Sequence, residues 1–423
     1  MVSLIKRMAP VLAGFAVLIA STTQVQSSET VLRVETYNVG LAHGFVDYAE
    51  QRAPAIWDAV AKSDADVVCL QEVWTDDDRD DAVDALAGSH PHAWLTENAQ
   101  KKASKSPVCK RKDLFGEGKF VSCLTGSCGG LEGDALTNCI IDQCEPIMNE
   151  LKNDKPECAN ALMAQVGKSA PAALWTVVRP IRKAGVFAYD GSDGLVMVSK
   201  YPLANTGMVD FTDKSTLNRR RALYADVQTG DTTTRVYCTH LTADLDGIAP
   251  YPGPFASWND ENLNQVNELI EHANAFAGPA VLLGDFNCSL PDEQSGVKGE
   301  SDASCQAFLD AGFSDPIMDL HDCTYCEGNT LVGQDSGGDK LLDHAFIKGW
   351  QGQDGARTYD GTATIAAGEH SLSDHYGYAV SLGPIPLPPE PEPEPEPEFE
   401  CEEGDDGCVE PAEGPPNSGD PVE

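Results

Sequence analysis

Basic residues are scarce in this chain: 29 Lys and Arg stand against 67 Asp and Glu, for a formal net charge of −38. Proteins that grip nucleic acid gain much of their affinity by neutralising phosphates, so this composition argues against a chain-wide basic binding surface. However, 14 of the acidic residues follow Pro384 with no Lys or Arg among them. Much of the imbalance therefore lies in a tail, and a nuclease that binds through a metal and a few local arginines stays open as an alternative.

Long apolar runs are also lacking. The longest candidate, Met8 to Ala20, is too short to cross a hydrocarbon core of ~30 Å comfortably. It follows Lys6 and Arg7 and precedes a small, polar stretch that ends at Ser28, which is the order of a secretory signal peptide. We therefore predict a signal peptide at 1–28, no transmembrane segment and a secreted protein, with the periplasm or the cell surface as alternatives.

Cysteine, in contrast, is plentiful. Fourteen cysteines in an exported chain indicate disulfides, because the compartment beyond the membrane lets them persist. Cys69 and Cys238 are expected as buried thiols or a core disulfide, and Cys288 as a partner of Cys305, Cys323 or Cys326. A zinc site at Cys323 and Cys326 is a weaker alternative, since a lone C-x-x-C lacks a matching pair. Six cysteines crowd into one stretch and leave their pairing open: Cys109, Cys123, Cys128, Cys139, Cys144 and Cys158.

Strand-like and helix-like segments alternate from Val31, which predicts an α/β domain at 29–383. The cysteine-rich stretch at about 99–175 breaks this rhythm and is predicted to be a largely helical insertion, with helix expected at 134–166. The segment 384–400 is a Pro-Glu repeat, expected to be an extended linker, and 401–423 a disordered acidic tail. Expected strands are VLRVETYNV, DVVCLQEV, ALWTVVRP, GVFAYD, GLVMVSKYPL, ALYADV, TRVYCTHL, AVLLGDFN, LLDHAFI and YGYAVSL, with helices around 51–61 and 261–276.

Polar side chains stand where several of these strands should end. In α/β sheets such ends collect ligand sites, so the polar residues are expected to converge on one pocket. Singly, each has an ordinary explanation as a turn, cap or solvated residue. Together, carboxylates and amides suit a hard cation such as Mg²⁺, with Mn²⁺ or Ca²⁺ as alternatives, and histidines can pass protons. The candidates are Asn38, Glu72, His240, Asp285, Asn287, Asp374 and His375.

The ordered motifs TYN, LQEV, SKYPL, THL, GDFN, LDH and SDH resemble those of the endonuclease/exonuclease/phosphatase superfamily, over roughly residues 31–383. The resemblance implies a deoxyribonuclease I-like fold, a four-layer sandwich of two mixed β-sheets flanked by helices. It also implies hydrolysis of a phosphate ester by metal-assisted water attack.

Residue roles follow from the same resemblance. Glu72 would be the main metal ligand, with Asn38 and Asp374 beside it. His375 would be a general base or would steady the phosphate, with Asp343 orienting its ring. The other three would act on the reacting groups: Asp285 on the attacking water, Asn287 on a phosphate oxygen, and His240 on the phosphate or the leaving group.

For the substrate, the middle of the chain is most similar to exported sphingomyelinase C-type enzymes, so a phospholipid at a membrane surface is the expected partner. Alternatives are a secreted endonuclease acting on nucleic acid and a non-enzymatic binding module. No aromatic hairpin for lipid contact is evident, although Tyr251, Phe255 and Trp258 offer a substitute. The Arg219-Arg220-Arg221 cluster is interpreted mainly as a solvated face, as are the insertion's basic residues Lys101, Lys102, Lys105, Lys110, Arg111, Lys112 and Lys119; binding to anionic headgroups or to nucleic-acid phosphates is the alternative for both.

Overall fold

The computed structural model describes residues 32–99, 106–131, 133–166, 168–178, 187–333 and 337–385. The predicted signal peptide, the Pro-Glu linker and the acidic tail lie outside these residues. In the described part of the chain, no helix has both the length and the apolar character needed to cross a membrane.

The first sheet has six strands in the order β10-β13-β1-β2-β4-β3. Only β1 and β2 within it run parallel, and the other neighbours are antiparallel. Both central strands are buried along most of their length: β2 is almost wholly apolar, as expected for a strand covered on both faces, whereas β1 includes buried polar residues such as Glu35 and Thr36. The strands are β1 (Leu32–Asn38), β2 (Val67–Gln71), β3 (His92–Trp94), β4 (Val196–Ser199), β10 (Gln351–Thr358) and β13 (Gly377–Gly383).

The second sheet has five strands in chain order, of which β7 and β8 are parallel. Its strands are β5 (Leu203–Asp210), β6 (Arg221–Thr229), β7 (Thr232–His240), β8 (Ala280–Asp285) and β9 (Asp343–Lys348). A separate hairpin pairs β11 (Thr362–Ile365) with β12 (Gly368–Ser371), and three short 3-10 turns, η1 (Tyr189–Gly191), η2 (Thr212–Lys214) and η3 (Pro316–Leu320), complete the connections.

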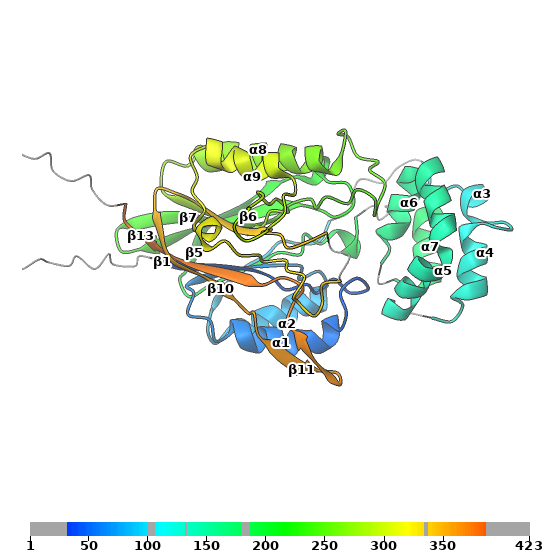
Figure 1. Ribbon diagram of the computed structural model, residues 1–423, viewed down its shortest axis with the longest axis horizontal. Helices are drawn as coiled ribbons and strands as arrows, with labels where there is room; N and C mark the ends of the chain where they lie inside the picture. The colour runs from blue at the N-terminus through cyan, green and yellow to red at the C-terminus, as the bar shows by residue number, and fades with distance from the viewer. Residues whose placement is uncertain are drawn as a thin grey trace, which may run out of the picture. The chain divides into compact units, whose positions relative to one another are not determined.

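The two sheets pack face to face and helices cover their outer faces (Figure 1). Helices α1 (Ala49–Val60) and α2 (Asp76–Leu86) pack on the first sheet, and α8 (Trp258–Asn274) and α9 (Asp302–Asp310) pack on the second. A disulfide between Cys69 of β2 and Cys238 of β7 joins the sheets through the shared core. This arrangement confirms the predicted four-layer sandwich.

Five helices make up the insertion: α3 (Arg111–Leu114), α4 (Phe120–Ser127), α5 (Gly133–Asp154), α6 (Pro156–Met163) and α7 (Ala170–Val178). Its six cysteines pair in a nested order, Cys109–Cys158 outside Cys123–Cys144 outside Cys128–Cys139. The disulfides enclose a small apolar core of their own, including Leu114, Phe120 and Leu151. The insertion is therefore a helical unit whose core is separate from those of the sandwich.

Two expected strands were wrong. ALWTVVRP belongs to helix α7 as far as Val178, and the described part of GVFAYD forms a turn that includes η1. The β-branched and aromatic residues of α7 favour a strand by composition, but tertiary packing overrides that preference because Val177 is buried in the insertion core. Pro171 lies in the first turn, where a helix tolerates proline.

Candidate active site

The register of the second sheet brings three of the candidate residues side by side. His240 ends β7 and pairs with Asp285 at the end of β8, and Asp285 pairs with Asp343 at the start of β9. In the first sheet, Asn38 ends β1 beside Gln71, the last residue of β2. The two sheet edges meet there, because the Asn38 amide donates a hydrogen bond to Asp285 Oδ2 over 2.9 Å.

Asp285 lies at the centre of this cluster. Its Oδ1 accepts a 2.9 Å hydrogen bond from the backbone N–H of Asn287, and its Oδ2 lies 3.5 Å from His240 Nε2 and 3.9 Å from His375 Nε2. Burial, followed by the neighbouring Asp343 carboxylate, raises the pKa of Asp285 to about 7. Its ionised form is thus poised to take a proton near neutral pH.

His375 is held by Asp343, whose Oδ2 accepts a 2.7 Å hydrogen bond from its Nδ1. Burial alone would lower the pKa of His375, but the carboxylates of Asp343, Asp285 and Asp374 raise it well above the ordinary value. The pKa of His240 moves the other way, to well below the ordinary value, because the ring is buried and lies near Arg220 and His375. The site thus contains one histidine that favours the charged form and one that favours the neutral form.

Glu72 and Asp374 supply a second pair of carboxylates beside Asn38. Burial and the negative charge of Asp374 raise the pKa of Glu72, while His375, Arg220 and the Asn38 amide oppose this shift. Glu72 adopts a left-handed backbone conformation with φ of 62°, uncommon outside glycine and frequent at functional sites. The backbone turn after β2 therefore aims the side chain, and two repelling carboxylates are held together.

A close approach of the backbone makes room for Asp374. A Cβ on Gly40 would lie 2.3 Å from Asp374 Oδ1, and Gly40 has φ of +57°, so only glycine fits there without strain. Buried Arg52 of α1 fixes this turn by donating to the carbonyls of Gly40 and Val39, and it donates to Leu372 O near Asp374. The donor set of carboxylate and amide oxygens beside Gly40 fits a hard divalent cation such as Mg²⁺.

Asn287 and the loops around it are positioned by α8. The Asn287 side chain donates to Leu241 O over 3.1 Å, which uses one of its two amide hydrogens. From α8, Asn262 donates to Thr242 O and Phe286 O, while the carboxylate of buried Glu261 accepts from Thr242 and Tyr251. These buried polar residues hold the segments that leave β7 and β8, so they orient His240 and Asp285 indirectly.

Arg220 is a site residue that the sequence interpretation missed. The expected solvated face was wrong for its cluster, since Arg219, Arg220 and Arg221 are 4 %, 6 % and 5 % exposed. Burial lowers the pKa of Arg220 to about 10, against the opposing effect of Glu72, Asp285 and Glu261. Its Nη1 makes no hydrogen bond in the described structure, and its guanidinium lies 5.7 Å from the Trp74 ring. In the sequence, the one signal for this buried cation was a run of three arginines before a strand. That run does not show which carboxylates surround it.

Other expectations for the surroundings had mixed outcomes. Trp258 is buried at the start of α8 and packs edge-on against Tyr251, whose hydroxyl donates to Glu261, so these two residues serve packing. Tyr325 was not predicted, yet its ring lies 5.1 Å from that of His375. Lys119 pairs with Glu150 at the insertion surface, as expected for a solvated face, whereas Lys101, Lys102 and Lys105 lie outside the described residues.

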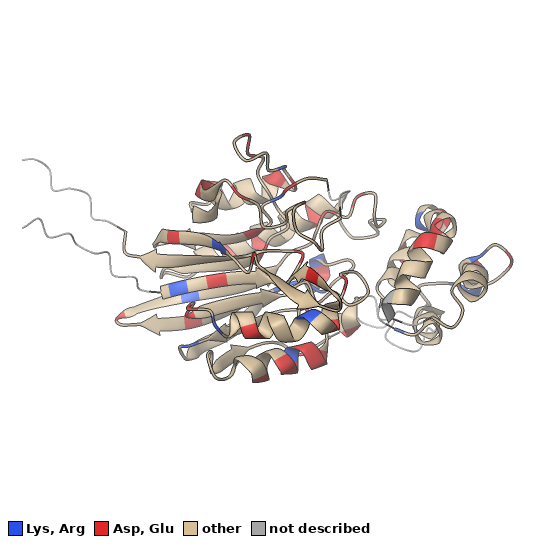
Figure 2. Ribbon diagram, turned by 60° about the horizontal axis from the view of Figure 1, so that its bottom comes forward, with Lys and Arg blue, Asp and Glu red and all other residues tan. Residues whose placement is uncertain are grey.

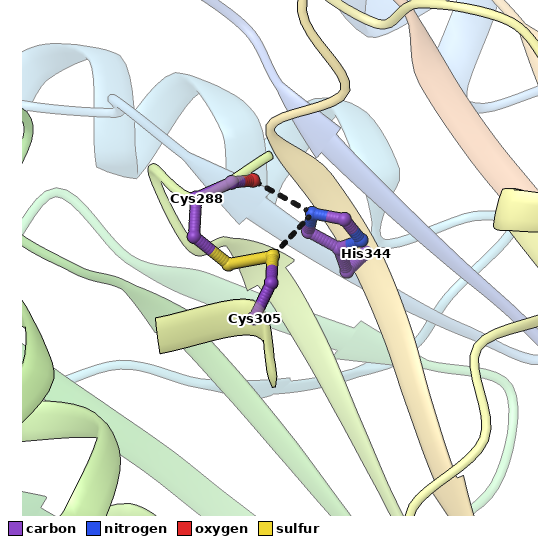
Figure 3. A group of neighbouring side chains, drawn as sticks. All are labelled: Cys288, Cys305 and His344. Carbon is purple, nitrogen blue, oxygen red and sulfur yellow. Dashed lines mark hydrogen bonds between the residues drawn. A yellow bond between two sulfur atoms is a disulfide. The ribbon is translucent and has the colours of Figure 1, made fainter. Parts of the chain in front are cut away.

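The four cysteines near the second sheet form disulfides instead of a metal site. Cys288 pairs with Cys305 and Cys323 pairs with Cys326, so the zinc alternative was wrong because neither sulfur of that pair is a free thiolate. His344 lies beside the first of these disulfides and donates from Nε2 to Cys288 O over 2.9 Å (Figure 3). By contrast, Asp285, Asp343 and His375 offer polar atoms within 4.8 Å of one another without any disulfide sulfur.

The fold and the polar strand-end cluster together define an α/β sandwich with a hydrolase-type site. The sequence profile of the Endonuclease/Exonuclease/phosphatase family matches residues 36–375, and the chain belongs to this family. That membership supports a phosphoester hydrolase. No curated protein matches the chain significantly.

Solved structures with a similar fold have low sequence identity to this chain. An endonuclease/exonuclease/phosphatase from Beutenbergia cavernae is 16% identical, with a TM-score of 0.45 over 84% of this chain and 71% of that one. Sphingomyelinase C from Streptomyces griseocarneus is 16% identical, with a TM-score of 0.45 over 83% and 98%. TDP2 from Caenorhabditis elegans is 12% identical, with a TM-score of 0.45 over 83% and 74%.

Proposed function

We propose that this chain is a secreted, divalent-metal-dependent phosphodiesterase that acts on a phospholipid-like ester. The observation that carries the proposal is the buried constellation around Asp285, with His240 and His375 on its two sides and Asn38 bonded to it. Carboxylate, imidazole and guanidinium groups converge at one sheet edge, as metal-assisted hydrolysis of a phosphate ester requires.

The metal would be held by Glu72 and Asp374 with the Asn38 side-chain oxygen nearby. When bound, Mg²⁺ or a similar ion would polarise a phosphoryl oxygen and neutralise charge that grows in the transition state. The like charges of Glu72 and Asp374 support this assignment, since burial and the nearby Asp374 carboxylate both raise the pKa of Glu72, and a bound cation would offset that repulsion.

The chain's own groups divide the remaining work. Asp285 would orient the attacking water and accept its proton, because its Oδ2 lies between the two histidine rings. His375, fixed by Asp343, and Arg220 would face the phosphate with positive charge. Neutral His240 and the second amide hydrogen of Asn287 would donate to phosphate oxygens. Preorganised donors of this kind need no reorganisation when charge develops.

The surroundings favour a small or amphiphilic ester over a polynucleotide. A cavity of about 1190 Å³ next to Trp74 is lined by Asp76, Asp77 and Asp78 and by further acids of α1 and α2. Acidic residues also outnumber basic ones on the ribbon in Figure 2. The acidic residues around this cavity would repel a polyanion such as DNA, which supports the lipid-like substrate over the endonuclease alternative.

The test compares three substrates with and without metal. Purified mature protein would be assayed for phosphocholine release from sphingomyelin vesicles, nicking of plasmid DNA, and turnover of bis(4-nitrophenyl) phosphate, each with Mg²⁺ or EDTA. We expect metal-dependent phosphocholine release and turnover of the soluble ester. We expect Glu72→Gln to reduce both by about 10³-fold, and Glu271→Gln, a matched exchange on the exposed side of α8, to leave them unchanged.

Each alternative has its own signature in these assays. Plasmid nicking without phosphocholine release would favour the endonuclease. Inactivity on all three substrates with metal present would favour the binding module, and wild-type turnover by Glu72→Gln would reject the metal site.

A further inference from the structure

The insertion contains an apolar cavity that the proposed chemistry does not use. Its volume is about 670 Å³, and side chains of α4, α5, α6 and α7 form most of its wall, among them Leu124, Ile140, Met148 and Leu174. Phe45 and the Gly247–Ile248 segment of the sandwich complete the lining. This volume lies within the range of cavities that hold a single small ligand.

The rim of this cavity exposes large apolar side chains. Phe45, Ile141 and Ile248 all line it and are 54%, 55% and 61% exposed. They come from three distant parts of the sequence, so their meeting is a product of the fold. Soluble proteins seldom gather exposed apolar groups around a hollow unless something apolar binds there.

The cavity adjoins a second cavity, which reaches toward the candidate active site, through two of its own residues. Val166 and Lys168 line both this cavity and the neighbouring one of about 1190 Å³, which reaches Trp74 and Tyr189. The Trp74 ring stacks on Tyr189 at 5.0 Å and lies 5.9 Å from the ring of His240. The two cavities therefore share wall residues, and Trp74, a wall residue of the second cavity, lies beside a candidate catalytic histidine.

The loops that form the rim also begin at the site. Phe45 follows Asn38 by seven residues, and Ile248 follows His240 by eight. Lys152 of α5 donates to Ile248 O over 2.6 Å, and Lys168 pairs with Asp190 of η1 over 2.5 Å. The first contact ties the insertion to the loop that leaves β7, and the second ties it to the turn that precedes β4.

We propose that the insertion cavity binds the aliphatic chain of an amphiphilic phosphodiester whose ester group lies at Asp285 and Glu72. This inference rests on the proposed phosphodiesterase function and specifies its substrate. The ionic ester group of that substrate would lie at the strand ends, and its apolar chain would lie between α4, α5 and α7. Each methylene that enters the cavity should tighten binding by about fourfold, given the free energy of burying a CH₂ group.

The experiment measures binding apart from turnover. Isothermal titration calorimetry of the full mature protein with butyl-, octyl- and dodecylphosphocholine, each below its critical micelle concentration, varies only the chain. We expect the Kd to fall by at least about tenfold from butyl to octyl. Leu174→Trp, which places a larger ring in the cavity, should abolish this dependence and leave the Kd of butylphosphocholine unchanged.

Two milder variants test the proposal in case Leu174→Trp disturbs the folding of the insertion. Ile141→Ser at the rim should weaken dodecylphosphocholine binding by about tenfold. Leu131→Ser is the matched control, because Leu131 is an exposed apolar residue of the insertion, at 40%, that does not line the cavity. Equal losses in both variants would overturn the proposal.

Other outcomes separate the inference from the proposed function. A Kd independent of chain length, or binding to sphingomyelin vesicles without binding of monomeric alkylphosphocholines, would overturn the cavity assignment. Chain-length-dependent binding that Leu174→Trp abolishes, in a protein that hydrolyses none of the phosphodiesters, would support the cavity and reject the phosphodiesterase.

Discussion

Two aspartate–histidine pairs share strand β9 but face different surroundings. Asp343 bonds His375 over 2.7 Å, and the next residue, His344, bonds Asp315 over 2.5 Å. Successive residues of a strand point to opposite faces, so one pair opens to the site and the other is sealed beneath α9. The second ring nitrogen separates them further. His344 donates it to Cys288 O, whereas His375 Nε2 has Asp285 Oδ2 only at 3.9 Å, too far for a hydrogen bond. An unsatisfied nitrogen, rather than the pair itself, marks the histidine that can meet a substrate.

The strongest test of this contrast is His375→Ala. Loss of the imidazole should lower the kcat of bis(4-nitrophenyl) phosphate hydrolysis by about 10³-fold, because a positioned proton-carrying or charge-stabilising group is removed. The urea midpoint should fall as well, because the buried Asp343 carboxylate loses its partner, so kcat is measured well below the unfolding transition. His370→Ala, in the nearby strand β12, is the matched control and should keep full activity. Retained kcat in His375→Ala would remove this residue from the site.

Arg220 and Arg221 extend the contrast to neighbouring arginines. Arg221 is paired with acids, although its Nε makes no hydrogen bond: it donates to Thr96 Oγ1 and lies 3.6 Å from Asp193 and 3.4 Å from Asp210. Arg220 has an unpartnered Nη1 beside the candidate site. We expect Arg220→Met to reduce kcat by about 10²-fold and to leave the melting temperature unchanged or higher, because a poorly paired buried charge is removed.

Arg221→Met is the counterpart of that variant. It should lower the melting temperature, because Asp193 loses its buried partner, and it should affect kcat less than Arg220→Met does. Kinetics and thermal unfolding of both variants check the pair. A larger loss of activity in Arg221→Met would reverse the assignment.

The sandwich could be predicted because its signals are local. Apolar runs of strand length ending in Asn38, Gln71, His240 and Asp285 identified both the strands and the edge at which they meet. The sheets then brought the polar ends together through the parallel pairs β1–β2 and β7–β8. The predicted site residues were for this reason found around one sheet edge.

Features that depend on long-range packing were not predictable. The strand expected at ALWTVVRP is helix α7, because its neighbours in the insertion bury Val177. Arg220 appeared to be one of three solvated arginines, since no local pattern indicates the carboxylates that meet it in the fold. The nested disulfides likewise depend on how α4 and α5 pack, which spacing alone does not determine.

The buried His344–Asp315 pair gives a smaller expected effect than His375 or the two arginines, and this effect is on stability alone. Both ring nitrogens of His344 face acceptors, Asp315 Oδ2 and Cys288 O, so the geometry suits the imidazolium. Burial alone would lower the pKa of His344, but the Asp315 carboxylate and the Cys288 carbonyl raise it above the ordinary value of 6.5. A histidine with a raised folded-state pKa adds stability that is fully present below the unfolded-state pKa. That stability is lost as the pH rises through the folded-state value.

Asp315→Asn tests that sign. It should lower the free energy of unfolding by about 2 kcal/mol at pH 6, where the imidazolium loses its counter-charge, and by less at pH values above the raised pKa of His344. Urea unfolding of the wild type and the variant at several pH values measures the difference in their free energies of unfolding. Groups that titrate alike in both proteins do not contribute to this difference. The variant should hydrolyse bis(4-nitrophenyl) phosphate normally, because Asp315 is separated from His375 by β9 itself. A stability difference that grows with pH would mean that His344 is buried neutral and that the two pairs differ in charge as well as in access.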